Sequence, residues 1–582
     1  MRRWQLATGL SALVVALLAG CGDDEEGPAP PTSTGSTAVG GQGGTSAGGG
    51  LAGGGGGVVG GGGGGGFVPE TGDRSALYPA DWSPGFSITD EGEELFIQDY
   101  SYAGYHNGEA PLPSGDFAQL ITVSTTADGS VDVQQDIQDA LDQAAGTSNG
   151  AIVYLPAGTY RVDSPLEIRG DGIVLRGAGS GATELWLRHG GGASEQTALL
   201  VSAPGWLQLS DDPGWQITAE GSIFDTSVEV QDPSGISVGD DIHISWRITA
   251  EFKAEHESTD YWYHCSVGDL KTFFLRTVTA IVGDRIHFKV PLRYPVKLRD
   301  QPVVQLASGY ASENGVEHLS INTAMGGAAA SWQSGTNAAT AIRFRFCRDC
   351  WAQDVTSFAR SGEDYHLRSH GFAVERSFRV TIADSHLQKP EHLGGGGNGY
   401  LFQLTRSNEV LVRDSTGVDG RHNFSINWDF GSSGNVFQRI ESSGGRVCGT
   451  LQDQLDDNCG VGPSDFHHAL AIANLFDQVV IDDALQVGNR QDWSTGAGQT
   501  GTMNVFWNVS GTGMVYVYNQ AMGYVIGTSG VEVKTALDDP GWLETRLSLG
   551  SEPEDYTELI DQNTNIAPQS LYDELLARRL AQ

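Results

Sequence analysis

Histidine and arginine side chains recur in the middle of the chain at a spacing that could bring them together. Val380, Val410, Val436 and Val479 can be taken as equivalent positions of a repeating coil, and polar residues precede each of them by eleven to fourteen places. Neutral histidine is a suitable base near physiological pH, and arginine can neutralise a carboxylate. These groups could together remove a proton beside a carboxylate. The four windows are 366–369, 396–399, 422–425 and 465–468.

Equivalent positions in successive turns of a stacked coil lie about 4.8 Å apart, so this register predicts one polar strip. His422 or His468 is the candidate base, and Arg421 and Arg368 are the candidate neutralisers. The alternative for each histidine is a purely structural role. We predict catalytic roles for His422, His468, Arg421, Arg368, Lys389 and Asp465, and substrate-binding roles for His366, Asn398, Asn423, Arg490 and Trp262.

Short apolar runs with alternating polar residues surround these windows. Residues 374–382 and 404–412 are similar to each other, and weaker copies lie around 435–437 and 478–482. Alternation of this kind indicates short strands separated by tight bends, and its repetition indicates a solenoid built from strands. We therefore predict an all-β fold.

A helix is predicted before the first strands. Asp132 is a candidate N-cap with Gln135 three residues later, apolar residues recur at helical spacing, and Gly146 ends the pattern. Strands are expected over 151–162 and 166–179, where glycine and proline mark the corners.

The helix, followed by "VYLPAGTY" and "GIVLRGAG" within 151–179, resembles the start of the pectate-lyase-like superfamily. The resemblance implies a right-handed parallel β-helix with an N-terminal capping helix. Members include polysaccharide lyases, polygalacturonase-type hydrolases, an epimerase type and phage tailspikes. The resemblance covers about 117–190 and concerns residues of the architecture, so it identifies no catalyst.

The N-terminus has the features of a targeting segment. Arg2 and Arg3 precede an apolar run over 6–18, and Leu18-Ala19-Gly20-Cys21 resembles a bacterial lipobox. That resemblance implies export and acylation of Cys21, with anchoring in the outer membrane or at the cell surface of a Gram-negative bacterium. The following segment is acidic and then glycine-rich, which is typical of a flexible tether.

The composition shifts along the chain predict seven segments. The aromatic segment before the helix is expected to pack over the body, and the last residues are expected to form a short helix, with Ser570 as N-cap, that covers the final turn. The segments are a signal peptide (1–20), a lipidated tether (21–71), an N-terminal strap (72–116), the start of the β-helix (117–203), a strand-rich insert (204–300), the remaining β-helix (301–540) and a C-terminal strap with its helix (541–582).

The net charge is −38, which excludes a general nucleic-acid binder. Residues 341–490 hold 13 Arg and 1 Lys against 19 Asp and Glu, a net charge of −5, and they contain seven of the 14 histidines. This concentration of arginine and histidine favours an enzyme over a β-helix without catalytic activity. The expected partner is a polysaccharide, and the expected state is a monomer.

The cysteines predict at least one disulfide. Cys448 and Cys459 bracket a short polar loop and are expected to pair, as export permits. Cys347 and Cys350 could form a local bridge, or one of them could pair with Cys265. The lone C-x-x-C is weak evidence for zinc, and we predict no resident metal, although Ca²⁺ could assist a neutraliser.

Three activities remain open from the sequence. The favoured one is β-elimination of a uronate-containing polysaccharide. A polygalacturonase-type hydrolase is the second, because Asn427-Trp428-Asp429 and Asp482-Asp483 resemble part of that family's carboxylate set, although no Gly-His-Gly or Arg-x-Lys follows them. The third is a non-catalytic carbohydrate-binding or adhesive β-helix.

Overall fold

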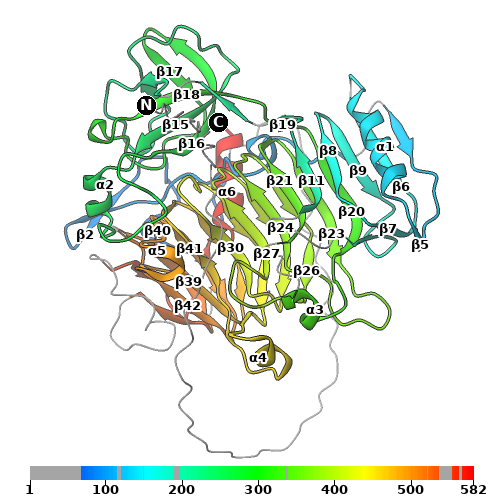
Figure 1. Ribbon diagram of the computed structural model, residues 1–582. Coiled ribbons are helices and arrows are strands. Elements are labelled where there is room, and N and C mark those ends of the chain that lie inside the picture. Colours follow the sequence, from blue (N-terminus) through cyan, green and yellow to red (C-terminus); the bar gives the residue numbers. More distant parts are fainter. Residues whose placement is uncertain are drawn as a thin grey trace, which may run out of the picture.

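A computed structural model shows a parallel β-helix with a second β-subdomain beside it (Figure 1). The structure describes residues 67–114, 119–148, 150–188, 197–205, 207–210, 213–333, 339–520, 522–535, 554–562 and 566–582. The predicted signal peptide, Cys21 and all but the last residues of the tether lie outside the described residues.

Ten strands stack in parallel to form one face of the coil, and this face carries the candidate site. Strand pairs such as Phe372 with Phe402 and Phe402 with Phe424 fix the register. In spatial order the strands are β8 (Leu166–Arg169), β11 (Thr197–Ser202), β21 (Thr340–Arg345), β24 (His370–Glu375), β27 (Tyr400–Thr405), β30 (His422–Asn427), β35 (Ser464–Phe466), β39 (Ala484–Val487), β42 (Met514–Val517) and β44 (Glu532–Lys534).

The other faces of the coil belong to a sheet of 19 strands. Its strands are β4 (Leu120–Thr122), β5 (Asp128–Asp132), β6 (Ala151–Leu155), β7 (Gly158–Val162), β9 (Ile173–Gly177), β10 (Thr183–Leu187), β20 (Gly315–Asn322), β23 (Trp351–Ser357), β25 (Thr381–Ala383), β26 (His386–Gln388), β28 (Leu411–Arg413), β29 (Thr416–Val418), β31 (Val436–Gln438), β32 (Glu441–Ser443), β37 (Leu475–Asp477), β38 (Val480–Ile481), β41 (Val505–Ser510), β43 (Tyr524–Ser529) and β45 (Tyr556–Glu558). The fold class predicted from the sequence is confirmed.

Inward-facing side chains form continuous stacks through the coil. Phe402 and Phe424 are stacked with ring centroids 4.8 Å apart, and Phe437 and Phe476 with centroids 4.6 Å apart. Complete burial of each such ring contributes about 1.5–3 kcal/mol. Because every rung adds its apolar residues to the same core, the coil can lengthen without a larger radius.

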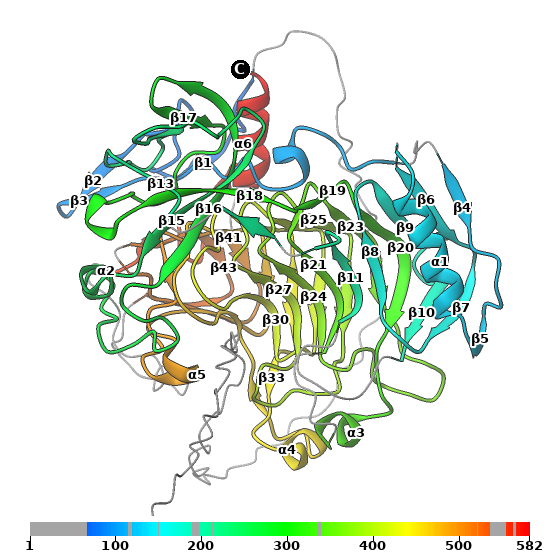
Figure 2. The same cartoon turned by 45° about the horizontal axis from the view of Figure 1, so that its top comes forward.

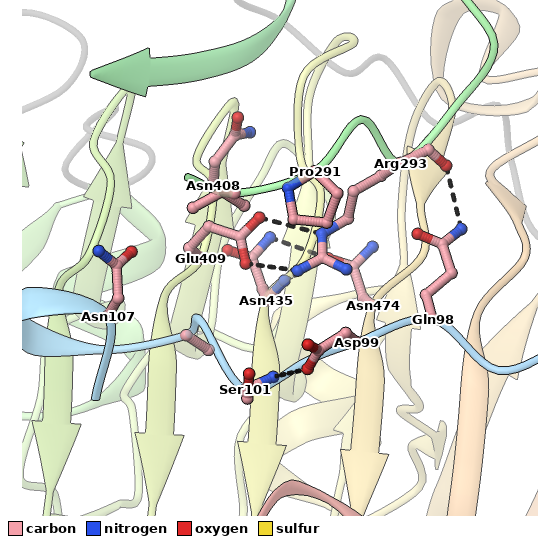
Figure 3. Close-up of polar contacts among 12 residues, drawn as sticks. Gln98, Asp99, Ser101, Asn107, Pro291, Arg293, Asn408, Glu409, Asn435 and Asn474 are labelled. Atoms are coloured by element: carbon pink, nitrogen blue, oxygen red, sulfur yellow. Dashed lines mark hydrogen bonds and ion pairs between the residues drawn. The ribbon is translucent and has the colours of Figure 1, made fainter. Parts of the chain in front are cut away.

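An asparagine ladder lines one corner of the coil. Asn474 Oδ1 accepts hydrogen bonds from the backbone N–H and the side-chain amide of Asn435, and Asn504 Oδ1 accepts the equivalent pair from Asn474. Asn435 and Asn474 lie close to the buried ion pair of Arg293 and Glu409 (Figure 3). The ladder satisfies backbone donors that the corner would otherwise leave unpaired inside the protein.

Helix α1 (Gln134–Ala145) packs against the first strands of the coil at one end of the molecule (Figure 1). Its N-cap is Val133 rather than Asp132. The Asp132 carboxylate accepts a hydrogen bond from the backbone N–H of Gln134, so it still satisfies a donor of the first turn. Ile137, Leu141 and the other apolar residues of the predicted stripe are buried.

The insert forms its own seven-stranded sheet with a separate apolar core. Trp246 stacks on Phe273 with ring centroids 3.6 Å apart, and Trp262 is completely buried, with its indole N–H donating to the backbone oxygen of Gln499. The sheet contains β12 (Gln208–Leu209), β13 (Trp215–Gln216), β14 (Ser227–Glu229), β15 (Asp241–Arg247), β16 (Leu270–Val282), β17 (Arg285–Phe288) and β18 (Val303–Ser308), and α2 (Ala250–Glu255) follows β15.

The N-terminal strap and α6 (Leu571–Leu580) pack together on the outside of the 19-stranded sheet. Ser570 caps α6 as predicted, accepting from the backbone N–H of Asp573, but the helix does not cover the final turn. Its first turn donates to Asp477 in the middle of the coil. The apolar face of α6 instead meets Leu475 and Val505, which explains this position.

Cys448 and Cys459 form a disulfide that closes the loop carrying α4 (Leu451–Leu455). The bridges considered for the other cysteines are wrong: Cys265, Cys347 and Cys350 are buried free thiols. Helix α4 lies beside α3 (Ala328–Gln333) (Figure 2). No helix among the described residues is long and apolar enough to cross a bilayer.

Candidate functional site

Three aromatic or imidazole rings stack across consecutive strands on the outside of the ten-stranded sheet. His370, Tyr400 and His422 begin β24, β27 and β30. The ring centroids of His370 and Tyr400 lie 5.0 Å apart, and those of Tyr400 and His422 lie 4.7 Å apart. This stack is the centre of the candidate site, and its neighbours decide which nitrogen and oxygen atoms can exchange protons.

Tyr400, His467 and Asp465 form a hydrogen-bonded relay. Asp465 Oδ2 lies 2.6 Å from His467 Nδ1, and His467 Nε2 lies 3.2 Å from the Tyr400 hydroxyl. Because the carboxylate accepts the Nδ1 proton, Nε2 carries the lone pair and accepts the tyrosine proton. Asp465 Oδ1 accepts a hydrogen bond from Ser425, which fixes the carboxylate. The phenol therefore lies beside a group able to take or return its proton.

His422 presents a second imidazole with a defined tautomer. Its Nδ1 lies 2.6 Å from the backbone oxygen of Pro463, which can only accept, so Nδ1 carries the proton. Its Nε2 then holds a lone pair and has no hydrogen-bond partner among the described residues. Burial lowers the pKa of His422 well below the ordinary value, which keeps the ring neutral at physiological pH.

Arg421 adjoins the stacked rings, and Arg368 lies near His392. Arg421 Nη1 lies 3.4 Å from the Tyr400 hydroxyl, and its guanidinium lies 5.9 Å from the centre of that ring. Arg368 is completely buried. The pKa of His392 is lowered to about 4 by burial and then by Arg421 and Arg368, which places both cations near one imidazole. A negative group entering here would meet fixed positive charge.

The relay has very little exposed surface. Tyr400 and His467 are 0% exposed and His422 is 4% exposed. The backbone oxygen of Gly397 accepts a hydrogen bond from His370 Nε2, and Arg490 Nη1 donates to the backbone oxygen of His467. A substrate can therefore reach the relay only if covering segments move.

His468 lies at the edge of this cluster rather than in the relay. Its ring stacks on Trp428, with centroids 4.1 Å apart, and meets the ring of His264 of the insert, with centroids 5.1 Å apart. His467 and His468 have ring centroids 5.6 Å apart. His422 and His468 were the two predicted bases; the ring of His422 stacks on Tyr400 and His467 contacts its hydroxyl, whereas His468 lies beyond them.

Several predicted residues lie nearby but serve the structure. The Asn423 side chain bonds Ser442, Ser443 and Asp483 inside the coil, and Asn398 bonds Ser369 and two glycine carbonyls. His366 bonds the Ser357 hydroxyl, while Lys389 is exposed. The assignment of Trp262 to substrate binding is wrong, since its ring is completely buried between the insert and the coil, 5.0 Å from the ring centroid of Phe430.

Tyr400 and His467 are not among the residues predicted to act. The prediction placed each polar window at a constant distance before its valine, but Tyr400 lies 11 residues before Leu411, whereas their register partners His422 and Val436 are 14 residues apart. The next rung is longer, because Ser425 pairs with Asp465, 40 residues later. The excursion that contains α4 causes the longer interval. The His467-His468 doublet beside Asp465 was the available signal for the second histidine.

The carboxylates considered for hydrolysis are occupied by structural contacts. Asp429 Oδ2 lies 3.1 Å from Lys271 and 3.0 Å from Arg406. Asp483 is buried and accepts hydrogen bonds from Ser442 and Asn423. These contacts do not favour the acid and base roles that a hydrolase needs.

His422, Asp465 and His467 could hold a metal ion, because their ligand atoms lie within 4.8 Å of one another. Two nitrogen ligands and one carboxylate suit zinc or another transition metal better than calcium, which prefers oxygen. In the present arrangement His467 and His422 instead donate to Asp465 and Pro463. The three side chains are therefore suited to hydrogen bonding within the relay at least as well as to coordination of a metal ion.

Acid should destabilise the protein through its buried imidazoles. An ordinary histidine has a pKa of about 6.5, so on unfolding below that pH these rings gain protons that the folded chain excludes. Stability from this source is lost as pH falls from about 6.5 toward the lowered pKa values of the folded chain. Burial lowers the pKa of His243, His264 and His370 to about 3, of His256 and His392 to about 4, and of His422 well below its ordinary value.

Three buried carboxyl groups have the opposite effect. Burial raises the pKa of Asp477 and Asp555 to about 7 and of Asp483 to about 6, so their stabilisation is lost as pH rises through those values. We expect the thermal midpoint to be highest between about pH 6 and 7. It should fall more steeply on the acid side, because the six histidines lose more stability there than the three carboxyl groups regain. Scanning calorimetry from pH 4.5 to 8.5 measures this, and a maximum at pH 5 would contradict it.

A cavity of about 510 Å³ lies away from this cluster. It is lined by the strap, by β16 of the insert and by a corner of the coil, including Tyr105, Lys289 and Arg379. Its charged groups are engaged in ion pairs: Lys289 pairs with Glu109, and Arg379 donates to both oxygens of Asp349 at 2.7 Å. We therefore place the candidate chemistry at the Tyr400 relay, beside His422, whose Nε2 has no hydrogen-bond partner among the described residues.

Residues 122–205 match the family model described as Rhamnogalacturonase A/epimerase, pectate lyase-like. The matched segment contains α1 and the first rungs, and it ends before the residues of the relay. None of the curated proteins matches the sequence.

Solved structures with a similar course of the chain include two phage tailspikes and one enzyme. Tailspike gp61 of Pseudomonas phage phi297 is 12% identical over 71% of this chain and 70% of its own, with a TM-score of 0.46. The Gp54 tailspike of Acinetobacter baumannii bacteriophage AP22, solved with a capsular saccharide, is 12% identical over 74% and 66%, with a TM-score of 0.36. The DFA-IIIase of Arthrobacter chlorophenolicus A6 is 11% identical over 76% and 93%, with a TM-score of 0.34. Similarity this low carries no argument about activity.

Proposed function

We propose that this parallel β-helix, whose residues 122–205 match a pectate-lyase-like family model, is a polysaccharide lyase that cleaves a uronate-containing glycan by β-elimination. The observation that carries the proposal is the pair of proton sites on adjacent strands. His422 Nε2 holds a lone pair, the Tyr400 hydroxyl holds a proton, and their rings are stacked 4.7 Å apart.

In the proposed reaction His422 Nε2 removes the proton next to the uronate carboxylate. The released electron pair forms the ring double bond as the bond from the ring carbon to the 4-linked oxygen breaks. The Tyr400 hydroxyl gives its proton to that oxygen, and the resulting phenolate is stabilised by Arg421. After the products leave, His422 releases the proton that it took to water, and the phenolate regains one proton from water by way of His467, which restores the starting state. Arg421 also lies where it can neutralise the substrate carboxylate.

The test is a screen of acidic polysaccharides with two readouts. A lyase produces unsaturated ends that absorb in the ultraviolet, whereas a hydrolase produces new reducing ends without that absorbance. Absorbance that rises together with reducing ends supports β-elimination. Reducing ends alone would overturn it.

The burial of the relay favours one second candidate, a glycan-binding protein without turnover. Tyr400 and His467 have no exposed surface. A protein that only binds glycans does not need to expose them, whereas an enzyme that uses them must first move the segments that cover them. Saturable binding of a glycan with no product of either kind would support this candidate.

We also propose that the protein is exported and held at a membrane by lipid on Cys21, on the strength of the lipobox-like sequence. A Cys21→Ser variant should move from the membrane fraction to the soluble fraction of the producing cells. An unchanged distribution in detergent-free fractionation would contradict the anchor.

A further inference from the structure

A row of basic side chains follows the ends of the strands that begin with the stacked rings. Glu375 pairs with Thr405 and Thr405 with Asn427, so Arg376, Arg406 and Trp428 occupy the same corner position in successive rungs. Their φ angles of 48°, 49° and 48° are all in the left-handed region. We call Arg376 and Arg406, with Arg345 beside them, the arginine row.

Several basic side chains gather at the row and share two carboxylates. Arg345 lies 2.8 Å from Glu375, Arg343 lies 3.1 Å from the same oxygen, and Arg376 lies 3.9 Å from the other. Arg406 and Lys271 share Asp429. The net charge of the chain is −38, so this strip differs from the protein as a whole. A local group of cationic side chains attracts anions to one strip of an otherwise acidic protein.

Arg376 is the most available member. Its side chain is 40% exposed, against 27% for Arg406, and it has no hydrogen-bonding partner among the described residues. Burial and then the neighbouring Arg406 lower its pKa, as expected for a cation beside like charge. An anion at this position would relieve the repulsion and fill the open donors of the guanidinium.

The row leads to the candidate site. One rung beyond Arg406 lies Trp428, whose ring stacks on His468, and His468 adjoins His467 of the relay. A polymer lying along the coil axis over Arg376 and Arg406 would therefore reach the edge of the relay. Successive rungs are spaced by about 4.8 Å, so the row offers closely repeated positive charges in that direction.

From this geometry we propose that Arg376 and Arg406 bind the anionic groups of a glycan that runs along the coil. They would thus form anion-binding subsites of the glycan site, next to the relay. The carboxylates of uronates and the sulfates of sulfated sugars share this chemistry. That the polymer is a glycan rests on the proposed function; that the two arginines bind anionic groups rests on the geometry of the row.

The test is binding by the mature chain to polygalacturonate, dextran sulfate and uncharged dextran, measured by affinity electrophoresis at low and high salt. We expect binding to a charged polymer that weakens with salt, and a loss of about tenfold or more in an Arg376→Ala/Arg406→Ala variant. Arg376→Ala alone should show part of the loss, and it removes no hydrogen bond, so its fold should be intact. Arg285→Ala, an exposed arginine of the insert, is the matched control.

The polymer that is bound more tightly identifies carboxylate or sulfate as the preferred group. Equal binding of dextran and the charged polymers, or unchanged binding in the double variant, would overturn the arginine row. Because binding is measured without turnover, a wild-type chain that binds through the row but releases no unsaturated product would overturn the lyase proposal alone.

Discussion

Replacing Tyr400 with phenylalanine should lower kcat on the cleaved polysaccharide by about 10²- to 10⁴-fold, the usual contribution of a positioned acid or base. The substitution removes the hydroxyl that lies between His467 and Arg421 and keeps the ring that stacks on His370 and His422. The proposed binding contacts at Arg376 and Arg406 are retained, so KM should change little. Initial rates of ultraviolet absorbance give both constants.

The control is the same substitution elsewhere on the same face. Tyr516 lies in β42 on the ten-stranded sheet, two strands beyond Asp465 in the register, and is not one of the three relay residues, so Tyr516→Phe should retain full kcat. Loss of one hydrogen-bonded hydroxyl costs about 0.5–1.5 kcal/mol of stability, so both variants should melt near the wild type. A Tyr400→Phe enzyme with undiminished kcat would remove Tyr400 from the mechanism.

Replacing Glu409 with glutamine should destabilise the folded chain by about 3–5 kcal/mol, because it leaves a buried arginine without its counter-charge. Arg293 is completely buried and donates to both Glu409 oxygens, at 3.0 and 2.8 Å (Figure 3). Arg276, also buried, has its nearest charged partner in Glu409 at 3.9 Å. This ion pair joins the insert to a corner of the coil, so its loss affects the contact between them.

The free energy of unfolding is measured by denaturant titration at pH 7. The matched control is Glu229→Gln, since Glu229 pairs with Arg285 at the surface, where such a pair contributes about 0–1 kcal/mol. If the free energies of unfolding of Glu409→Gln and the control differ by less than 1 kcal/mol, the prediction is wrong. Water or a rearranged side chain would then compensate the charge of Arg293.

Local patterns predicted the regular parts of the molecule. The capping helix was predicted to within its first turn, because Ile137, Leu141 and Ala144 recur on one face, and the C-terminal helix was predicted with its Ser570 cap. Each rung has the same short pattern: apolar and polar residues alternate over the length of a strand, and turn residues follow. Each strand must bury its apolar face, so the repeated pattern produces a stacked coil.

The register of the site could not be obtained in the same way. Val380 and Val410 belong to equivalent positions, but Val436 pairs with Leu411, one residue out of step. Loops outside the strands set the number of residues between rungs, and their lengths vary freely because they do not enter the core. The distance between the polar strand and the valine also differs from rung to rung, which left Tyr400 just outside the predicted window 396–399.

The sequence by itself determined that this chain forms a coil of short strands with a polar, histidine-rich middle, since alternation and composition act over a few residues. Only the tertiary structure decided that Tyr400, His467 and Asp465 meet, that the insert buries Trp262, and that arginines of separate rungs form one row. Those contacts join residues that are tens of positions apart, and their geometry depends on how every intervening loop is accommodated.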